Sequence, residues 1–138
     1  MFFRGLLAGK WGIRDVDDCL HAAKSLSGII DTTRTVIRGR SSGGYTVLSA
    51  LSFGLDNMFY AAGTSLYGIS SLRLLTQFTH KFELRYMDKL IGGTIEEFPR
   101  LYDEDRSPLY HADKIGTPLL VGCRSHCLFS SHMNLYAY

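Results

Sequence analysis

One short stretch, residues 39–43, constrains the fold of this 138-residue chain more than any other. It reads Gly-Arg-Ser-Ser-Gly and therefore matches the pattern G-x-S-x-G. β-Branched residues over 35–39 predict a strand before it, and apolar residues at helical spacing over 42–53 predict a helix after it. A strand that turns sharply into a helix at a serine is the geometry of a nucleophile elbow. We therefore predict that Ser41 is a catalytic nucleophile.

The small residues around Ser41 fit the strained backbone that such a turn requires. Gly39 and Gly43 are expected to leave space beside the serine, and Gly44 is expected to let the helix approach the strand closely. The backbone N–H of Ser42 is predicted as an oxyanion donor, because a helix N-terminus carries free N–H groups and partial positive charge. The local pattern alone leaves a Ser/Gly turn without chemistry equally open. A phosphate-binding loop is disfavoured, since no Gly-Lys-Ser/Thr follows.

Strand and helix patterns alternate along most of the chain, which predicts an α/β fold with a parallel sheet flanked by helices. The expected helices run over 15–26, 42–53 and 71–91, and the expected strands over 35–39, 59–66 and 117–121. We expect the strands to be neighbours in that order, and Asp15 to cap the first helix. Residues 92–107 have the composition of a loop, and residues 111–115 that of a short helical turn.

The overall composition argues against several classes of partner. The 15 Lys and Arg residues stand against 13 Asp and Glu without clustering, which predicts no nucleic-acid partner and no membrane partner. No apolar run is long enough to cross a bilayer, and Arg4 and Lys10 interrupt the N-terminal run, so no signal peptide is expected. The three cysteines cannot all pair, and reduced thiols in the cytoplasm are the expectation.

A group of potential ligands near the C-terminus suggests zinc, but its spacing is unfavourable. Cys123, His126, Cys127 and His132 fall within ten positions. Structural zinc sites bring two ligand pairs together from the ends of a longer loop, which is lacking here. We therefore predict no metal and no cofactor.

Residues 37–48 resemble the nucleophile segment of the prolyl oligopeptidase family, especially of its acylaminoacyl-peptidase and dipeptidyl-peptidase-like branches. Residues 62–68, 106–108 and 114–121 are similar to later segments of the same family. The resemblance runs in order over residues 4–121. It implies a partial α/β-hydrolase fold and a serine peptidase that cleaves short peptides through an acyl-enzyme, with a His as base and an Asp that orients it. A carboxylesterase on the same fold is the alternative enzyme.

The resemblance also implies a substrate-binding role for Phe82. Phe78, Phe82 and Tyr86 form an aromatic stripe at helical spacing, similar to the segment that lines the first specificity pocket of the family. Packing in the core explains the same stripe equally well.

The end of the chain departs from the family pattern. Triad order places the acid after the third strand and the base later still, yet no Asp or Glu follows Asp113. His126 and His132 stand outside any family-like context. We therefore expect a partial catalytic domain at residues 1–121 and a divergent, irregular tail at residues 122–138, with a catalytically inactive fragment as the alternative. The first strand is expected to lack a preceding neighbour, and this unpaired edge predicts self-association.

Overall fold

The structure, a computed structural model, describes residues 5–78 and 81–122, and for residues 81–84 it describes the backbone alone. Its centre is a sheet of three parallel strands, β1 (Val36–Arg40), β2 (Ala62–Leu66) and β3 (Leu119–Gly122). The strands pair in the order β1-β2-β3, which confirms the predicted order. Gly122 belongs to β3, whereas the sequence placed it at the start of the tail. Residues 123–138 lie outside the described part of the chain.

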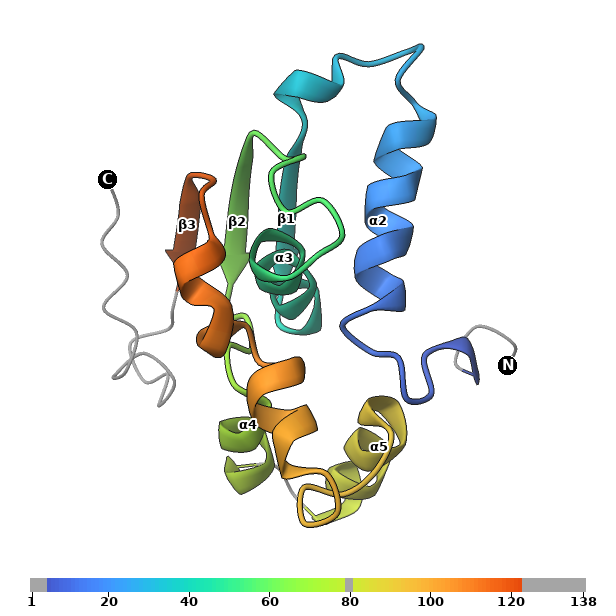
Figure 1. Cartoon of the computed structure of the whole chain (residues 1–138), viewed down its shortest axis with the longest axis vertical. Coiled ribbons are helices and arrows are strands. Elements are labelled where there is room, and N and C mark those ends of the chain that lie inside the picture. The colour runs from blue at the N-terminus through green and yellow to red at the C-terminus, as the bar shows by residue number, and fades with distance from the viewer. Residues whose placement is uncertain (1–4, 79–80, 123–138) are drawn as a thin grey trace.

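Helices cover one face of this sheet and the region beyond its carboxyl end. The longer ones are α2 (Arg14–Ser25), α3 (Ser42–Ser52), α4 (Leu72–Phe78) and α5 (Lys81–Ile91), and the short turns are η1 (Thr32–Arg34), η2 (Leu101–Asp105) and η3 (Pro108–Lys114). Helix α3 packs on β1 and β2, and α2 packs on α3. Helices α4 and α5 lie beyond the carboxyl ends of the strands (Figure 1).

Helix α3 is the central element of the fold. Eight of its 11 residues are buried, as expected for a helix that has neighbours on several sides. Val47, Ala50 and Leu51 pack with Val16 of α2 and with Tyr60. The approach to the sheet is close, because a Cβ atom on Gly63 of β2 would lie only 2.5 Å from Cδ1 of Leu51.

A second core cluster lies between α3 and the helices at the carboxyl end of the sheet. Its buried members come from segments far apart in the sequence: Trp11, Tyr45, Leu72, Met87, Leu90, Ile91 and Tyr102. Tyr45 reaches this cluster from α3, and its ring lies 4.5 Å from that of Trp11. The two clusters together fix α3 between the sheet and the segment that begins at Leu72.

Two predicted elements differ from the structure. The single helix expected over 71–91 is two helices, α4 and α5, and residues 79–80 between them lie outside the described part. The loop expected over 92–107 contains the turn η2, because Tyr102 inserts into the core and is completely buried. Periodicity alone could not reveal either feature, since both depend on contacts made across the fold.

Smaller corrections concern the ends of elements. Asp15 does not cap α2, because the helix begins at Arg14 and its cap position is Ile13. The carboxylate of Asp15 instead accepts hydrogen bonds from Gly12 N–H at 2.6 Å and from the Thr46 hydroxyl at 2.7 Å, which joins the start of α2 to α3. Strand β2 begins at Ala62 rather than at residue 59, since Tyr60 turns into the core.

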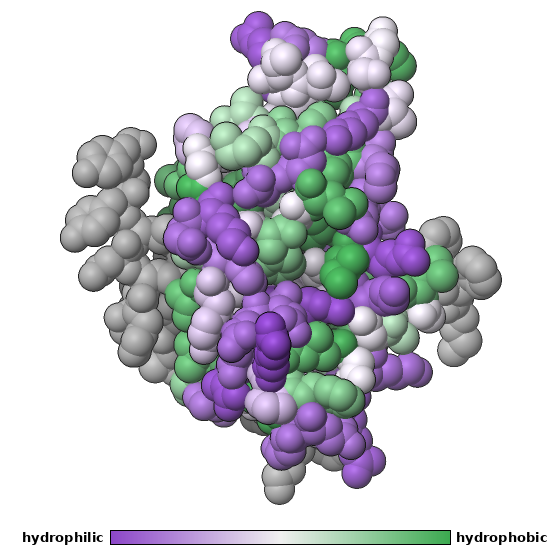
Figure 2. Space-filling model, viewed as in Figure 1, coloured by the Kyte–Doolittle hydropathy of each residue, from purple (hydrophilic) through white to green (hydrophobic). Residues whose placement is uncertain are grey.

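The face of the sheet opposite α3 is open among the described residues. Val36 on β1 and Leu120 on β3 are 62% and 60% exposed. Only β2 pairs with β1 in this part of the chain, so the other edge of β1 is unpaired. The face seen in Figure 2 presents apolar side chains among hydrophilic ones. Leu55 and Met58, in the segment between α3 and β2, are also exposed. In the described ranges, no helix is long and apolar enough to span a membrane.

Candidate active site

Ser41 lies at the turn between β1 and α3. Strand β1 ends at Arg40 and α3 begins at Ser42, so the predicted strand-turn-helix geometry is confirmed. The backbone of Ser41 has φ 55° and ψ −119°, a region that residues other than glycine rarely adopt. Such strain costs about 1–3 kcal/mol and concentrates at functional sites. The geometry is therefore that of a nucleophile elbow, while the catalytic role of Ser41 stays a prediction.

Backbone hydrogen bonds hold this strained residue from both sides. The Ser41 N–H donates to the Leu66 carbonyl at 2.9 Å, which ties the turn to the end of β2. The Tyr45 N–H donates to the Ser41 carbonyl at 3.0 Å, which is the first hydrogen bond of α3. Ser41 is exposed to solvent at the carboxyl edge of the sheet, where a substrate can reach it.

Two of the three predicted glycines are required by close backbone contacts. A Cβ on Gly39 would lie 2.1 Å from the Gly43 carbonyl oxygen, and one on Gly44 would lie 2.7 Å from Cα of Gly68. The expectation for Gly43 was wrong, because a Cβ there would meet nothing within 4 Å. It is the carbonyl of Gly43, rather than its missing side chain, that occupies the space which Gly39 leaves free.

The N–H of Ser42, the predicted oxyanion donor, lies in the first turn of α3. Because the first helical hydrogen bond is donated by Tyr45, the N–H groups of Ser42, Gly43 and Gly44 belong to the first turn. N–H groups in a first turn have no acceptor within the helix and point toward the region before it. The Ser42 N–H, next to Ser41, remains the predicted oxyanion donor, with the partial positive charge of the helix start behind it.

The described residues bring no histidine to Ser41. His21 is exposed on α2, and His111 contacts Lys114, the Glu104 carbonyl and the Phe53 ring. Phe53 follows the last residue of α3, and an 11-residue helix is about 16 Å long, so His111 lies near the opposite end of α3 from Ser41. His80, His126 and His132 lie outside the described residues.

An apolar cavity of about 430 Å³ opens beside the residue that follows Ser41. Its lining residues come from the N-terminal segment, the start of α3, the connection between β2 and α4, and helices α4 and α5: Leu7, Trp11, Ser42, Ile69, Leu75, Tyr86, Met87 and Leu90. We call it the Trp11 cavity. Its volume and its mostly apolar lining with few polar groups are typical of small-molecule sites.

A buried arginine fixes the wall of the Trp11 cavity that contains Trp11. Arg106 is only 7% exposed, and its guanidinium donates to the carbonyls of Trp11 at 2.5 Å and Gly9 at 3.1 Å. The Tyr45 hydroxyl donates to the Arg106 carbonyl at 2.8 Å. Burial lowers the pKa of Arg106 and raises that of Tyr45 well above its usual value. Tyr45 therefore acts as a neutral donor in a rigid, desolvated wall.

The aromatic stripe contributes to the cavity in part. Tyr86 lines it, whereas the side chain of Phe82 falls outside the described residues, so the predicted role of Phe82 stays a prediction. The sequence did not identify Trp11 as a cavity residue, although it is the only tryptophan of the chain. A large aromatic residue between Lys10 and Gly12 was the available signal, but only the fold places it beside Ser42.

Potential metal ligands do not gather in the described part of the chain. Within residues 5–78 and 81–122, no three His, Cys, Asp or Glu side chains lie close enough to hold an ion. The four residues whose spacing is unfavourable for zinc lie outside these ranges: Cys123, His126, Cys127 and His132.

Comparison with known proteins places this geometry in a family. The sequence model of the prolyl oligopeptidase family matches residues 2–124. The chain is 32% identical to dipeptidyl peptidase family member 6 of Caenorhabditis elegans over 120 residues, which are 82% of this chain and 16% of that protein. It therefore spans about a sixth of the length of this curated relative.

Solved structures agree with the sequence comparison. A puromycin-hydrolyzing peptidase of Mycobacterium tuberculosis superimposes with a TM-score of 0.78 and 43% identity, over 86% of this chain and 18% of that one. An acylaminoacyl peptidase of Pyrococcus horikoshii gives a TM-score of 0.72 and 26% identity, over 86% of this chain and 19% of that one. The three parallel strands and their helices are thus part of an α/β-hydrolase fold.

Proposed function

Because this chain belongs to the prolyl oligopeptidase family, we propose that it carries the nucleophile of a serine-type peptidase and that Ser41 is this nucleophile. The observation that carries the proposal is the positive φ of Ser41 between β1 and α3. A strained serine at the carboxyl edge of a parallel sheet, next to an apolar cavity, has the position that acyl transfer requires.

The chemistry follows from the residues at the turn. Once a base takes the proton of the Ser41 hydroxyl, its Oγ attacks the carbonyl carbon of a peptide bond, and the π electrons of the C=O bond move to the carbonyl oxygen. The N–H of Ser42 donates to this oxyanion. Collapse of the tetrahedral intermediate breaks the C–N bond, the protonated base gives its proton to the leaving amine, and water hydrolyses the acyl-enzyme that remains. The Trp11 cavity, beside Ser42, receives an apolar side chain of a short peptide.

A base and an orienting acid must complete this mechanism. No Asp or Glu follows Asp113, and the described residues place no histidine beside Ser41. We propose that the 138-residue chain alone is inactive or nearly so, since loss of the triad partners costs several powers of ten in rate. A carboxylesterase is the second candidate, because the same elbow and oxyanion donor also serve ester hydrolysis. We keep the cytoplasm as the proposed location, on the three cysteines of the sequence.

The proposed partner besides a short peptide is a second copy of the chain, bound through the free edge of β1. The N–H groups of Ala61 and Ser41 pair with Thr35 and Leu66 across β1 and β2. Because N–H groups alternate along a strand, the Arg38 N–H faces the outer edge. If the β1 strands of two copies pair antiparallel about Arg38, the two Arg38 side chains lie opposite each other. Because these like charges repel, we expect association to be weak at low salt and stronger at high salt, which screens them.

Labelling with a fluorophosphonate tests the role of Ser41 separately from turnover. The 138-residue chain is incubated with the probe, with and without imidazole as an external base, and the adduct is located by mass spectrometry. We expect slow labelling that imidazole accelerates and that occurs at Ser41 in preference to the other serines. Equal labelling of a Ser41→Ala variant, or an adduct spread over many serines, would contradict the proposal.

A further inference from the structure

The turn η2 does not line the Trp11 cavity, yet it holds both helices that do. Ile69 and Leu75, before and within α4, form one wall. Met87 and Leu90 of α5 form part of the other. The side chains that attach these two helices to η2 are therefore in a position to set the distance between the walls.

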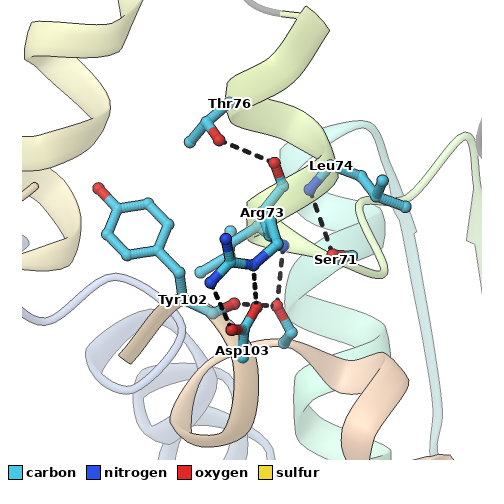
Figure 3. Close-up of polar contacts among 8 residues, drawn as sticks. Ser71, Arg73, Leu74, Thr76, Tyr102 and Asp103 are labelled. Atoms are coloured by element: carbon cyan, nitrogen blue, oxygen red, sulfur yellow. Dashed lines mark hydrogen bonds and ion pairs between the residues drawn. The ribbon is translucent and has the colours of Figure 1, made fainter. Parts of the chain in front are cut away.

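Helix α4 is attached to η2 by an ion pair with two hydrogen bonds. The Arg73 guanidinium donates from Nε to Oδ1 of Asp103 at 2.7 Å and from Nη2 to Oδ2 at 2.6 Å (Figure 3). Such a bidentate pair fixes orientation as well as distance. The pKa of Arg73 is raised, mainly because its side chain hydrogen-bonds to Asp103.

Serine hydroxyls fix the start of the same helix. The Ser107 hydroxyl accepts the Leu72 N–H at 2.8 Å and donates to the Tyr102 carbonyl, while the Ser71 hydroxyl accepts the Leu74 N–H at 3.3 Å. Helix α4 has only seven residues, and a helix this short has little stability of its own. Its position therefore depends on the contacts with the segment around η2.

Helix α5 is attached to η2 from the other side. The buried Tyr102 hydroxyl lies 2.8 Å from Oδ1 of Asp88 and 2.9 Å from the Gly93 carbonyl. Burial, followed by the hydrogen bond to Asp88, raises the pKa of Tyr102 well above its usual value. Adjacent residues of η2, Tyr102 and Asp103, thus hold the two walls of one cavity.

We propose that Arg73 and Asp103 are positioning residues that set the width of the Trp11 cavity and thereby the size of the apolar side chain it admits. The inference rests on the proposed function in one respect, namely that this cavity receives the substrate. One methylene in an apolar pocket changes discrimination by about 10-fold or more, so a small outward shift of α4 alters selectivity. Neither residue lines the cavity, so both act through Leu75 and its neighbours.

The test measures ligand binding by the full chain and does not need Ser41 chemistry. Trp11 is the only tryptophan in the sequence and lines the cavity, so its fluorescence reports occupancy. The probes are N-acetyl-phenylalaninamide and N-acetyl-valinamide, and the readout is the ratio of their dissociation constants. In Asp103→Asn we expect this ratio to change by about threefold or more, as expected for loss of a partly buried bidentate pair. Arg73→Lys, which keeps the charge and loses the fork, should give an intermediate ratio.

A matched control lies on the same turn. Glu104 pairs with Arg100 in an exposed ion pair, and Glu104→Gln should leave the ratio unchanged. If Asp103→Asn fails to fold, Arg73→Lys decides alone. A wild-type ratio in the folded variants, or no saturable change of Trp11 emission with either probe, would overturn the inference. Failure of Ser41 labelling, by contrast, would overturn the proposed function and leave these binding results valid.

Discussion

The elbow at Ser41 and the cap of the Trp11 cavity (α4, α5 and η2) are held together by different means. At the elbow, backbone atoms pack so closely that a Cβ on Gly39 would lie 2.1 Å from the Gly43 oxygen, four residues away. In the cap, side-chain hydrogen bonds hold the elements together, as between Arg73 and Asp103, which are 30 positions apart. Below the cap, Arg106 joins Trp11 across 95 positions. We therefore expect the stability of the elbow to fall when side-chain atoms are added, and that of the cap to fall when polar side chains are removed.

The largest expected effect tests this sensitivity at the elbow. Gly39→Ala places a Cβ against backbone that cannot move aside without breaking the turn, and should destabilise the chain by about 3 kcal/mol or more. Gly43→Ala is the matched control, since its Cβ meets nothing within 4 Å and alanine favours a helix. Urea unfolding followed by circular dichroism measures both. Similar stability of the two variants would contradict the close packing at Gly39.

The next effect concerns a polar group removed from beneath the cap. Arg106→Met leaves the buried carbonyl of Trp11 and the partly buried carbonyl of Gly9 without their donor, which should cost about 2–3 kcal/mol. Arg100→Met removes an arginine whose side chain is 75% exposed, and the change should stay within about 0.5 kcal/mol. Thermal unfolding of the two variants compares them directly. Equal losses would mean that burial of Arg106 has no energetic consequence.

A smaller difference in stability, with opposite signs at Ser41 and Ser42, should reveal the backbone strain at the nucleophile. Glycine tolerates φ 55°, so Ser41→Gly should be about 1 kcal/mol more stable than Ser41→Ala. At Ser42, inside α3, the order should reverse, because alanine is the better helix former. The same unfolding assay measures all four variants. A common order at both positions would argue against strain at Ser41.

The smallest effect is expected at the free edge of β1. Sedimentation velocity should detect self-association that becomes a few-fold tighter when salt screens the opposed Arg38 side chains. Arg38→Pro removes the outward N–H and the charge, and should yield a monomer at all salt concentrations. A wild-type chain that stays monomeric at high salt would exclude this edge as an interface.

The same contrast explains how much the sequence could predict. The elbow was predictable, because Gly39 and Ser41 act through neighbours in the chain at one strand-to-helix junction, although the close contact of Gly44 is with the distant Gly68. Strand order followed from the alternation of elements. The cap was not predictable, since Tyr102 and Asp103 lie in a stretch with loop composition and meet α4 and α5 only in the folded chain. The separation of α4 from α5 was missed for the same reason.

The elbow at Ser41 is formed, and we propose that the 138-residue chain does not supply the base that Ser41 needs. Hydrolysis of puromycin and of a simple ester by this chain, measured beside Ser41→Ala, tests the claim most directly; puromycin is chosen because the puromycin-hydrolyzing peptidase is 43% identical. We predict no turnover above the Ser41→Ala control. Ser41-dependent turnover at ordinary enzymatic rates would contradict the claim and would assign the base to a histidine of this chain, with His126 and His132 as the first candidates.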